Sequence, residues 1–175
     1  MKKRVLWIVM ILLGVSFMTG CTAKKNYAED EPFVIVTSAP AGPDDYRNMF
    51  DHNVAVYNDG RLVLYTEQSD DLKIQEDVPT LEKQLTEEQV NELKSVIEKN
   101  QFQNLKEDVT TPSEDGTFRY IVVNWTDKSK KVGGLNPDDS RFMEISDATF
   151  DLVEKEEYRH WADAVSDYIW EKNPD

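Results

Sequence analysis

The chain is poor in the residues on which many protein activities depend. It has one cysteine and two histidines in 175 residues, and its 20 lysines and arginines face 34 aspartates and glutamates. The net charge of −14 argues against nucleic-acid binding, which begins with a basic surface. A single cysteine excludes an intramolecular disulfide and a cysteine-rich metal site. The G-x-S-x-G, H-E-x-x-H and P-loop motifs are also absent from the sequence.

The N-terminus, by contrast, has the pattern of a secretory signal. Lys2, Lys3 and Arg4 precede an apolar run over residues 5–18, and no acidic residue occurs before Glu29. The run is shorter than the roughly 20 residues that a membrane-spanning helix needs, and it ends in small residues, as a cleavable signal does. We therefore expect a targeting segment rather than a permanent span.

The four residues Met18-Thr19-Gly20-Cys21 resemble the lipobox of bacterial lipoprotein precursors. The resemblance implies cleavage before Cys21 and a diacylglyceryl thioether on its sulfur, and two acyl chains give a stable anchor. It predicts a signal peptide over 1–20, a lipidated cysteine and tether over 21–32, and one extracytoplasmic domain over 33–175. An uncleaved N-terminal anchor is the alternative. In both cases the domain lies on the outer side of the cell membrane.

Two segments have the turn residues and strand composition of β-hairpins. In the first, strands over 54–57 and 61–65 flank Asn58-Asp59-Gly60, a three-residue turn with glycine in its last position. Pairing of Tyr57 with Arg61 puts four aliphatic side chains on one face, which we expect to form the core: Val54, Val56, Leu62 and Leu64. The second hairpin runs from 118–125 through 127–130 to 131–132. Its first strand is apolar on both faces, which suggests a central strand.

Two helices are expected beside these hairpins. Thr86 and Gln89 form a capping-box pattern behind Leu85, and Val90, Leu93 and Ile97 follow at helical spacing to about residue 100. The C-terminal stretch is helical by periodicity from near 147 or, at the latest, 157. Residues 80–84 suit a further strand. The sequence thus predicts an α+β fold, an antiparallel sheet of about four to five strands with two helices packed on one face.

Only one group of side chains suggests catalysis. Glu156, His160 and Asp163 are spaced so that two carboxylates could orient an imidazole or contribute to a metal site. The simpler interpretation is a solvated helix face, and the other histidine, His52, lies in a polar stretch without a helical partner. We expect no catalytic site and leave a hydrolase or metal-dependent enzyme at these three residues as the alternative.

Metal and phosphate sites find little support elsewhere in the sequence. Acidic residues cluster at 70–71, 107–108, 114–115 and 138–139, but none of these clusters has the spacing of an EF-hand loop. Gly133-Gly134 lacks the strand-to-helix context of a phosphate-binding loop and indicates a bulge or a close backbone approach. No metal and no cofactor is predicted.

A group of aromatic and aliphatic side chains is the main candidate for a binding site. If helices cover the aliphatic face of the first hairpin, six residues lie on the opposite face of the sheet: Tyr57, Val63, Tyr65, Phe118, Tyr120 and Val122. An exposed patch of this kind suits a protein or peptide partner. Alternatively, the face is covered by residues 33–36 or by Tyr46, Met49 and Phe50.

The mature domain resembles small bacterial lipoproteins built from an Asp-Gly hairpin, an L-T-x-x-Q/E helix and a second hairpin. This chain supplies Asn58-Asp59-Gly60 and Leu85-Thr86-Glu87-Glu88-Gln89. The resemblance supports a fold and identifies no catalytic residue. We expect a membrane-tethered, non-catalytic binding protein of the cell envelope. An inhibitor or chaperone of a secreted protein is a further alternative.

Overall fold

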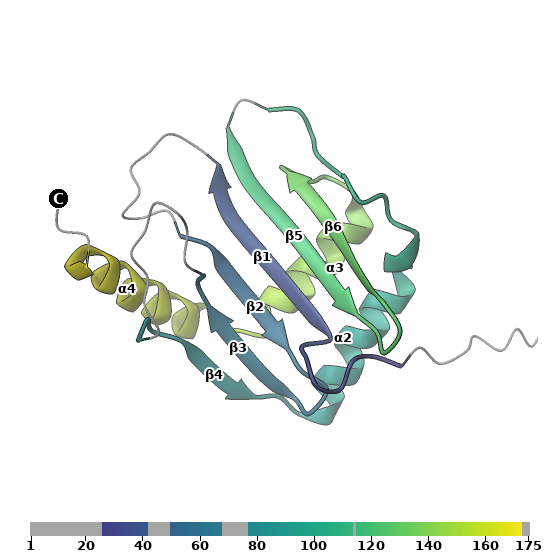
Figure 1. The fold of residues 1–175 in the computed structure, drawn as a ribbon, viewed down its shortest axis with the longest axis horizontal. Helices are drawn as coiled ribbons and strands as arrows, with labels where there is room; N and C mark the ends of the chain where they lie inside the picture. Colours follow the sequence, from purple (N-terminus) through teal and green to yellow (C-terminus); the bar gives the residue numbers. More distant parts are fainter. Residues whose placement is uncertain (1–25, 42–49, 68–76, 114, 173–175) are drawn as a thin grey trace, which may run out of the picture.

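A computed structural model describes residues 26–41, 50–67, 77–113 and 115–172 (Figure 1). The strands pair antiparallel in the order β4-β3-β2-β1-β5-β6. They are β1 (Val34–Ala41), β2 (His52–Val56), β3 (Arg61–Tyr65), β4 (Leu81–Gln84), β5 (Gly116–Asn124) and β6 (Ser129–Leu135). The helices are α2 (Glu87–Lys99), α3 (Ser140–Phe150) and α4 (Lys155–Lys172), with a short 3₁₀ turn η2 (Phe102–Asn104). The predicted α+β fold is confirmed.

Local turn chemistry produces both predicted hairpins. Gly60 adopts φ +88°, and the amide of Tyr57 donates to the carbonyl of Arg61 at 2.9 Å, which closes the β2–β3 turn. Val56 lies opposite Leu62, as the predicted pairing requires, and the four expected core residues of this hairpin are fully buried. In the second hairpin β6 continues to Leu135, beyond the predicted strand.

β1 is the element that the sequence did not predict as a strand. Residues 33–36 were considered as a segment that folds over the sheet, but Val34–Ala41 instead lies inside it, between β2 and β5. Its partners are distant in sequence, since Val36 pairs with Val54 on one side and with Ile121 on the other. β1 therefore joins the two hairpins into one sheet, which has one strand more than the upper expectation.

The described helices all lie on one side of the sheet, so the core forms between that side and the helical layer (Figure 1). Aliphatic residues at alternate positions of five strands are fully buried there: Val34, Val36, Val54, Val56, Leu62, Leu64, Ile121, Val123 and Val132. Buried aliphatic side chains are the dominant favourable contribution to folding, at about 1.5–3 kcal/mol each. The predicted core face of the first hairpin is confirmed.

Helix α2 begins where the capping box predicts. The Thr86 hydroxyl accepts a hydrogen bond from the Gln89 amide at 3.2 Å, and the Gln89 side chain accepts one from the Thr86 amide at 3.0 Å. These bonds satisfy two of the amides that every helix N-terminus leaves without an intrahelical partner. Val90, Leu93 and Ile97 are buried, as their spacing predicts.

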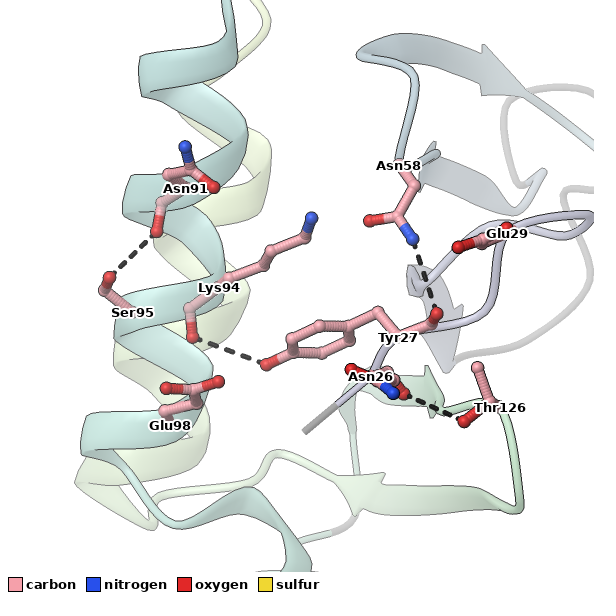
Figure 2. Close-up of a pocket in the computed structure, with 9 residues that line it drawn as sticks. All are labelled: Asn26, Tyr27, Glu29, Asn58, Asn91, Lys94, Ser95, Glu98 and Thr126. Carbon is pink, nitrogen blue, oxygen red and sulfur yellow. Dashed lines mark hydrogen bonds between the residues drawn. The ribbon is translucent and has the colours of Figure 1, made fainter. Parts of the chain in front are cut away.

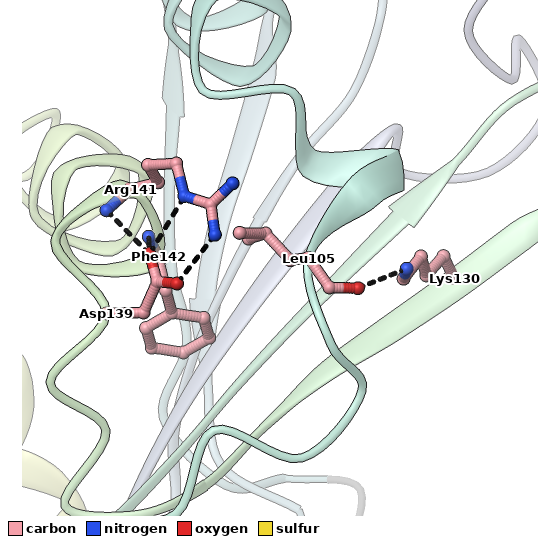
Figure 3. Close-up of polar contacts among 5 residues, drawn as sticks. All are labelled: Leu105, Lys130, Asp139, Arg141 and Phe142. Atoms are coloured by element: carbon pink, nitrogen blue, oxygen red, sulfur yellow. Dashed lines mark hydrogen bonds and ion pairs between the residues drawn. The ribbon is translucent and has the colours of Figure 1, made fainter.

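The C-terminal region contains two helices rather than one. Asp139 caps α3, accepting hydrogen bonds from the amides of Arg141 and Phe142, and its carboxylate pairs with the Arg141 guanidinium at 2.8 Å (Figure 3). The chain leaves helical pairing after Phe150 and resumes it at Lys155. The predicted C-terminal helix begins at Lys155, between the expected limits of 147 and 157, but α3 precedes it, so the helical layer has one helix more than predicted.

The outer edge of β6 is covered by the segment that follows η2. The amides of Val109 and Thr111 donate to the carbonyls of Gly133 and Leu135, and Asp108 bridges Gly133 in parallel. Lys130 ties the same edge to η2, because its ammonium donates to the carbonyl of Leu105 at 2.6 Å (Figure 3). The close backbone approach predicted at Gly133-Gly134 is found here, since a Cβ on Gly134 would lie 2.2 Å from Thr110 Oγ1.

The packed domain begins earlier than the predicted boundary at residue 33. Tyr27 and Ala28 are both buried, and Tyr27 bridges Trp125 at the end of β5. The Tyr27 ring lies 5.2 Å from the Phe33 ring in an edge-on arrangement. Residues 27 and 28 therefore pack with the domain, within the range 21–32 that the sequence predicts as lipidated cysteine and tether.

Candidate functional site

The enzyme-like residues do not assemble into a site. Glu156, His160 and Asp163 are exposed on the solvent side of α4, and the Glu156 carboxylate lies 3.9 Å from the Arg159 guanidinium. Across the part of the chain that the structure describes, no three His, Cys, Asp or Glu side chains gather closely enough to hold a metal ion. Among the described residues, no ion pair joins His160 to an acidic side chain of another element.

The acidic clusters singled out in the sequence serve local structure where they are described. The Asp108 carboxylate accepts a hydrogen bond from the Thr110 amide at 2.9 Å, and interaction with the Thr110 side chain, followed by this backbone contact, lowers the pKa of Asp108. Asp139 is the cap of α3, and its hydrogen bond to Arg141 lowers its pKa. Residues 70–71 and Glu114 lie outside the described residues.

The six predicted partner-binding residues lie together on the side of the sheet that no described helix covers. Strand register places them there, because their neighbours in the chain are the buried core residues. We call this surface the open sheet face. It comprises Tyr57, Val63, Tyr65, Phe118, Tyr120 and Val122, with Ile35, Thr37, Asn53, Ala55, Arg61 and Lys131 between and beside them.

The open sheet face contains stacked aromatic rings and two cationic groups that lie over tyrosine rings. Phe118 is 37% exposed, and its ring is nearly parallel to that of Tyr120 at a centroid distance of 6.3 Å. The Lys131 ammonium lies 4.2 Å from the Tyr120 ring centre, and the Arg61 guanidinium lies 3.6 Å from the Tyr57 ring centre. Cations over ring faces at such distances are attracted by about 0.5–1 kcal/mol at exposed sites. Both cations of this face are therefore held by its tyrosines.

Beside Phe118 and Tyr120 the surface is hollowed by a depression of about 410 Å³, which we call the β6 depression. Gly133 leaves room for it, since a Cβ there would lie 2.4 Å from the Tyr120 ring. Its other lining residues bring carboxylates next to the aromatic pair: Glu107, Asp108, Thr110, Lys131 and Gly134. An apolar surface with a charged rim is the usual anatomy of a protein-binding patch.

A second group of polar residues lies at the opposite side of the open sheet face. Thr37 donates to the Asn53 carboxamide oxygen at 2.6 Å, while the buried Asn53 amide nitrogen has no partner among the described residues. Burial, together with the nearby Glu67 carboxylate, raises the pKa of Asp51 and raises that of Tyr65 to about 12. Asp51 and Glu67 lie two residues beyond the paired Asn53 and Tyr65 in their chain segments, and we call these two carboxylates the acidic pair.

A polar cavity of about 620 Å³ separates α2 from the N-terminal segment (Figure 2). Asn58 extends into this region and donates to the carbonyl of Ala28 at 2.8 Å, and the Tyr27 hydroxyl donates to the carbonyl of Lys94 at 3.4 Å. The Lys94 ammonium lies 5.5 Å from the Tyr27 ring centre. These contacts attach the first described residues to the domain.

Sequence reasoning missed part of the open sheet face. Ile35 and Thr37 escaped because β1 was not predicted as a strand, although the β-branched run of residues 34–37 is a signal for one. Asn53 and the acidic pair lie next to predicted strands but show no distinctive motif. These residues come together through the register of the whole sheet, and the sequence predicted the register only within the two hairpins.

The predicted lipidation residue, Cys21, lies outside the described residues. Within the described ranges, no helix has both the length and the hydrophobicity needed to cross a bilayer. Neither a scan against protein-family models nor a search of curated proteins gives a match to this chain.

Proposed function

We propose that this protein is a lipoprotein tethered to the cell membrane on its extracytoplasmic side, and that it acts as a non-catalytic binding protein. The open sheet face is its binding surface for a protein or peptide of the cell envelope. The observation that carries the proposal is the one-sided fold: described helices cover one side of the sheet, and the other side presents tyrosine, phenylalanine and valine. Contiguous apolar surface on a folded domain marks an interaction site.

The alternatives have weaker support. An enzyme built on Glu156, His160 and Asp163 would need further groups around His160, and those three side chains are exposed on α4. An inhibitor or chaperone of a secreted protein would use the same open sheet face and is a special case of the binding function. The open sheet face is therefore the surface to test first.

The early start of the packed domain supports a close tether. Five residue steps separate Cys21 from Asn26, and an extended chain covers at most about 3.6 Å per residue, or roughly 18 Å in all. A lipid on Cys21 would hold the domain within that distance of the bilayer surface. Such a position suits a partner that is itself in the envelope.

The binding function is tested by changing the aromatic residues of the open sheet face. We expect Tyr65→Ser with Tyr120→Ser to abolish the crosslink between the protein and its partner in intact cells. The melting temperature should fall by only a few degrees, because Tyr65 and Tyr120 are half-exposed and cross-strand side-chain pairs contribute about 0.2–1 kcal/mol each. The measurement is photo-crosslinking from position Val63 or Val122, followed by affinity purification and mass spectrometry.

Trp170→Ser is the matched control, because Trp170 is 45% exposed but belongs to α4 on the other side of the sheet. It should leave the crosslink intact. Loss of the crosslink in the control as well, or a crosslink that persists in the double tyrosine variant, would count against the open sheet face. A collapse of stability in the double variant would show that the face is buried.

A further inference from the structure

Negative charge borders the open sheet face on two sides. The acidic pair, Asp51 and Glu67, adjoins β2 and β3, two residues beyond the Asn53–Tyr65 pair of the face. Across the sheet, Glu107 and Asp108 line the β6 depression next to Phe118 and Tyr120. Between the two sides the surface is mainly aromatic and aliphatic, with Lys131 over the Tyr120 ring and the Thr37–Asn53 pair as its polar groups. An occupant of the whole face therefore meets carboxylates at both ends and apolar side chains in the middle.

These carboxylates are not neutralised by the described part of the chain. No ion pair there involves Asp51, Glu67, Glu107 or Asp108. The two cations of the face are positioned over the rings of Tyr57 and Tyr120. The sequence next to the acidic pair adds no excess of positive charge, since residues 42–49 carry two Asp and one Arg, and residues 68–76 carry two Asp, one Glu and one Lys.

The two acidic sides have a defined separation. From β2 through β1 and β5 to β6 there are three strand spacings, and the segment paired to β6 at Asp108 adds a fourth. At roughly 4.8 Å each, the four spacings come to about 19 Å. An extended polypeptide advances roughly 3.3 Å per residue, so about six residues cross this distance.

We propose that the open sheet face binds an extended, cationic polypeptide segment that lies across the strands. Lysines or arginines about six residues apart meet the acidic pair at one end and Glu107 with Asp108 at the other. Apolar side chains between them lie on Val63, Val122 and the tyrosines. This inference rests on the proposed function, because it assigns the chemistry of the partner to the same binding surface.

The charge of the whole molecule favours the same partner. Removal of residues 1–20 discards three basic residues and no acidic one, which leaves 17 basic and 34 acidic residues and a net charge of −17. A surface of one sign attracts partners of the opposite sign and rejects those of its own. The local carboxylates then determine where on the molecule the cationic segment binds.

The test uses the full-length protein in detergent and a fluorescent ten-residue peptide that has two lysines at each end and six alternating Val and Thr between them. We expect binding that weakens as salt rises from 50 to 500 mM, and no binding of the peptide with glutamates in place of lysines. A peptide without the central stretch should bind about tenfold more weakly, because its outer lysines are only three residues, or roughly 10 Å, apart and reach only one acidic side.

The protein variants separate local from general attraction. Asp51→Asn with Glu67→Gln should weaken binding of the lysine peptide about tenfold. Glu88→Gln with Glu92→Gln changes the net charge equally at exposed positions of α2, on the other side of the sheet, and should leave binding unchanged. Both variants are compared at equal folded fraction, measured by thermal unfolding.

Equal weakening in the two variants, or equal binding of the glutamate and lysine peptides, would overturn the cationic segment. A concentration-dependent dimer that the lysine peptide does not dissociate would assign the face to a second copy of the chain instead. The proposed binding function is tested independently of the charge inference. If the crosslink from Val63 or Val122 persists in the Asp51→Asn, Glu67→Gln variant, the binding face stands and only the charge inference is lost.

Discussion

His52 is held inside an aromatic cluster that joins β2 to α4. Its ring lies 4.7 Å from the ring of Phe50 and 5.4 Å from those of Tyr158 and Trp161, measured between centroids. The Tyr158 hydroxyl is hydrogen-bonded to Nδ1 of His52. Burial disfavours the charged imidazolium and lowers the pKa of His52 from its ordinary 6.5 to about 4. His52 is therefore neutral in the folded protein at physiological pH.

This environment predicts a pH dependence of stability. Between pH 6.5 and pH 4 the unfolded chain binds a proton at His52 and the folded chain does not. His52 therefore does not lower the free energy of unfolding above pH 6.5. As the pH drops toward 4, its contribution lowers that free energy by about 1–3 kcal/mol. Urea unfolding of wild-type protein at pH 7 and pH 4.5 measures the loss, and His52→Gln should reduce it.

The second histidine provides the control for this experiment. His160→Gln should keep the wild-type pH dependence, because His160 is exposed on α4. Identical slopes for wild type and His52→Gln would show that other groups cause the loss. The contact between His52 and Tyr158 joins residues 106 positions apart, which explains why sequence reasoning found no partner for His52.

At the scale of elements, the close approach at β6 makes a prediction about one glycine. A Cβ on Gly133 would lie 2.2 Å from the carbonyl oxygen of Arg119 and 2.8 Å from Cα of Tyr120, both backbone atoms of β5. Because backbone in a central pairing does not move cheaply, Gly133→Ala should cost about 2 kcal/mol or more of unfolding free energy. Ser129→Ala, at an exposed position of the same strand, should change stability by less than about 0.5 kcal/mol. Equal losses of unfolding free energy for the two variants, measured by chemical denaturation, would refute the close approach at Gly133.

The elements that sequence predicted are those whose determinants are local. The capping box of α2 lies within Thr86–Gln89, and the β2–β3 turn is specified by Gly60 between two short strands. β1 depends on partners from both hairpins and contains Pro40, which argues against a strand on its own. The break between α3 and α4 spans residues 151–154, which contain no glycine or proline, so the sequence gives no stop signal. The position of β1 is therefore determined by long-range strand pairing rather than by a local sequence pattern.

The candidate site also contains one part that local sequence patterns predict and another that depends on long-range strand pairing. The six residues named from sequence follow from alternation within two hairpins, and this alternation is local. The acidic pair and the carboxylates of the β6 depression meet the face only because β1 joins the hairpins into one sheet. A surface that extends over five strands therefore could not be assembled from either hairpin alone.

At the scale of the whole molecule, charge bears on how the protein associates with a membrane. The net charge of −17 that the predicted removal of residues 1–20 would leave repels an anionic bilayer, so the folded domain would contribute no general attraction to it. Lys24 and Lys25 add at most about 1 kcal/mol each near such a surface. Stable association then requires the two acyl chains predicted on Cys21.

This reasoning predicts a specific response to Cys21→Ser. The wild-type protein should sediment with membranes and stay there in 1 M salt, because hydrophobic anchoring is not screened by ions whereas lysine contacts are. Cys21→Ser should abolish lipid attachment, and globomycin should make the wild-type precursor accumulate. Lys24→Gln with Lys25→Gln is the control and should remain bound. Release of the wild type by salt, or membrane association of Cys21→Ser after signal cleavage, would assign the attachment to the domain surface rather than to the lipid.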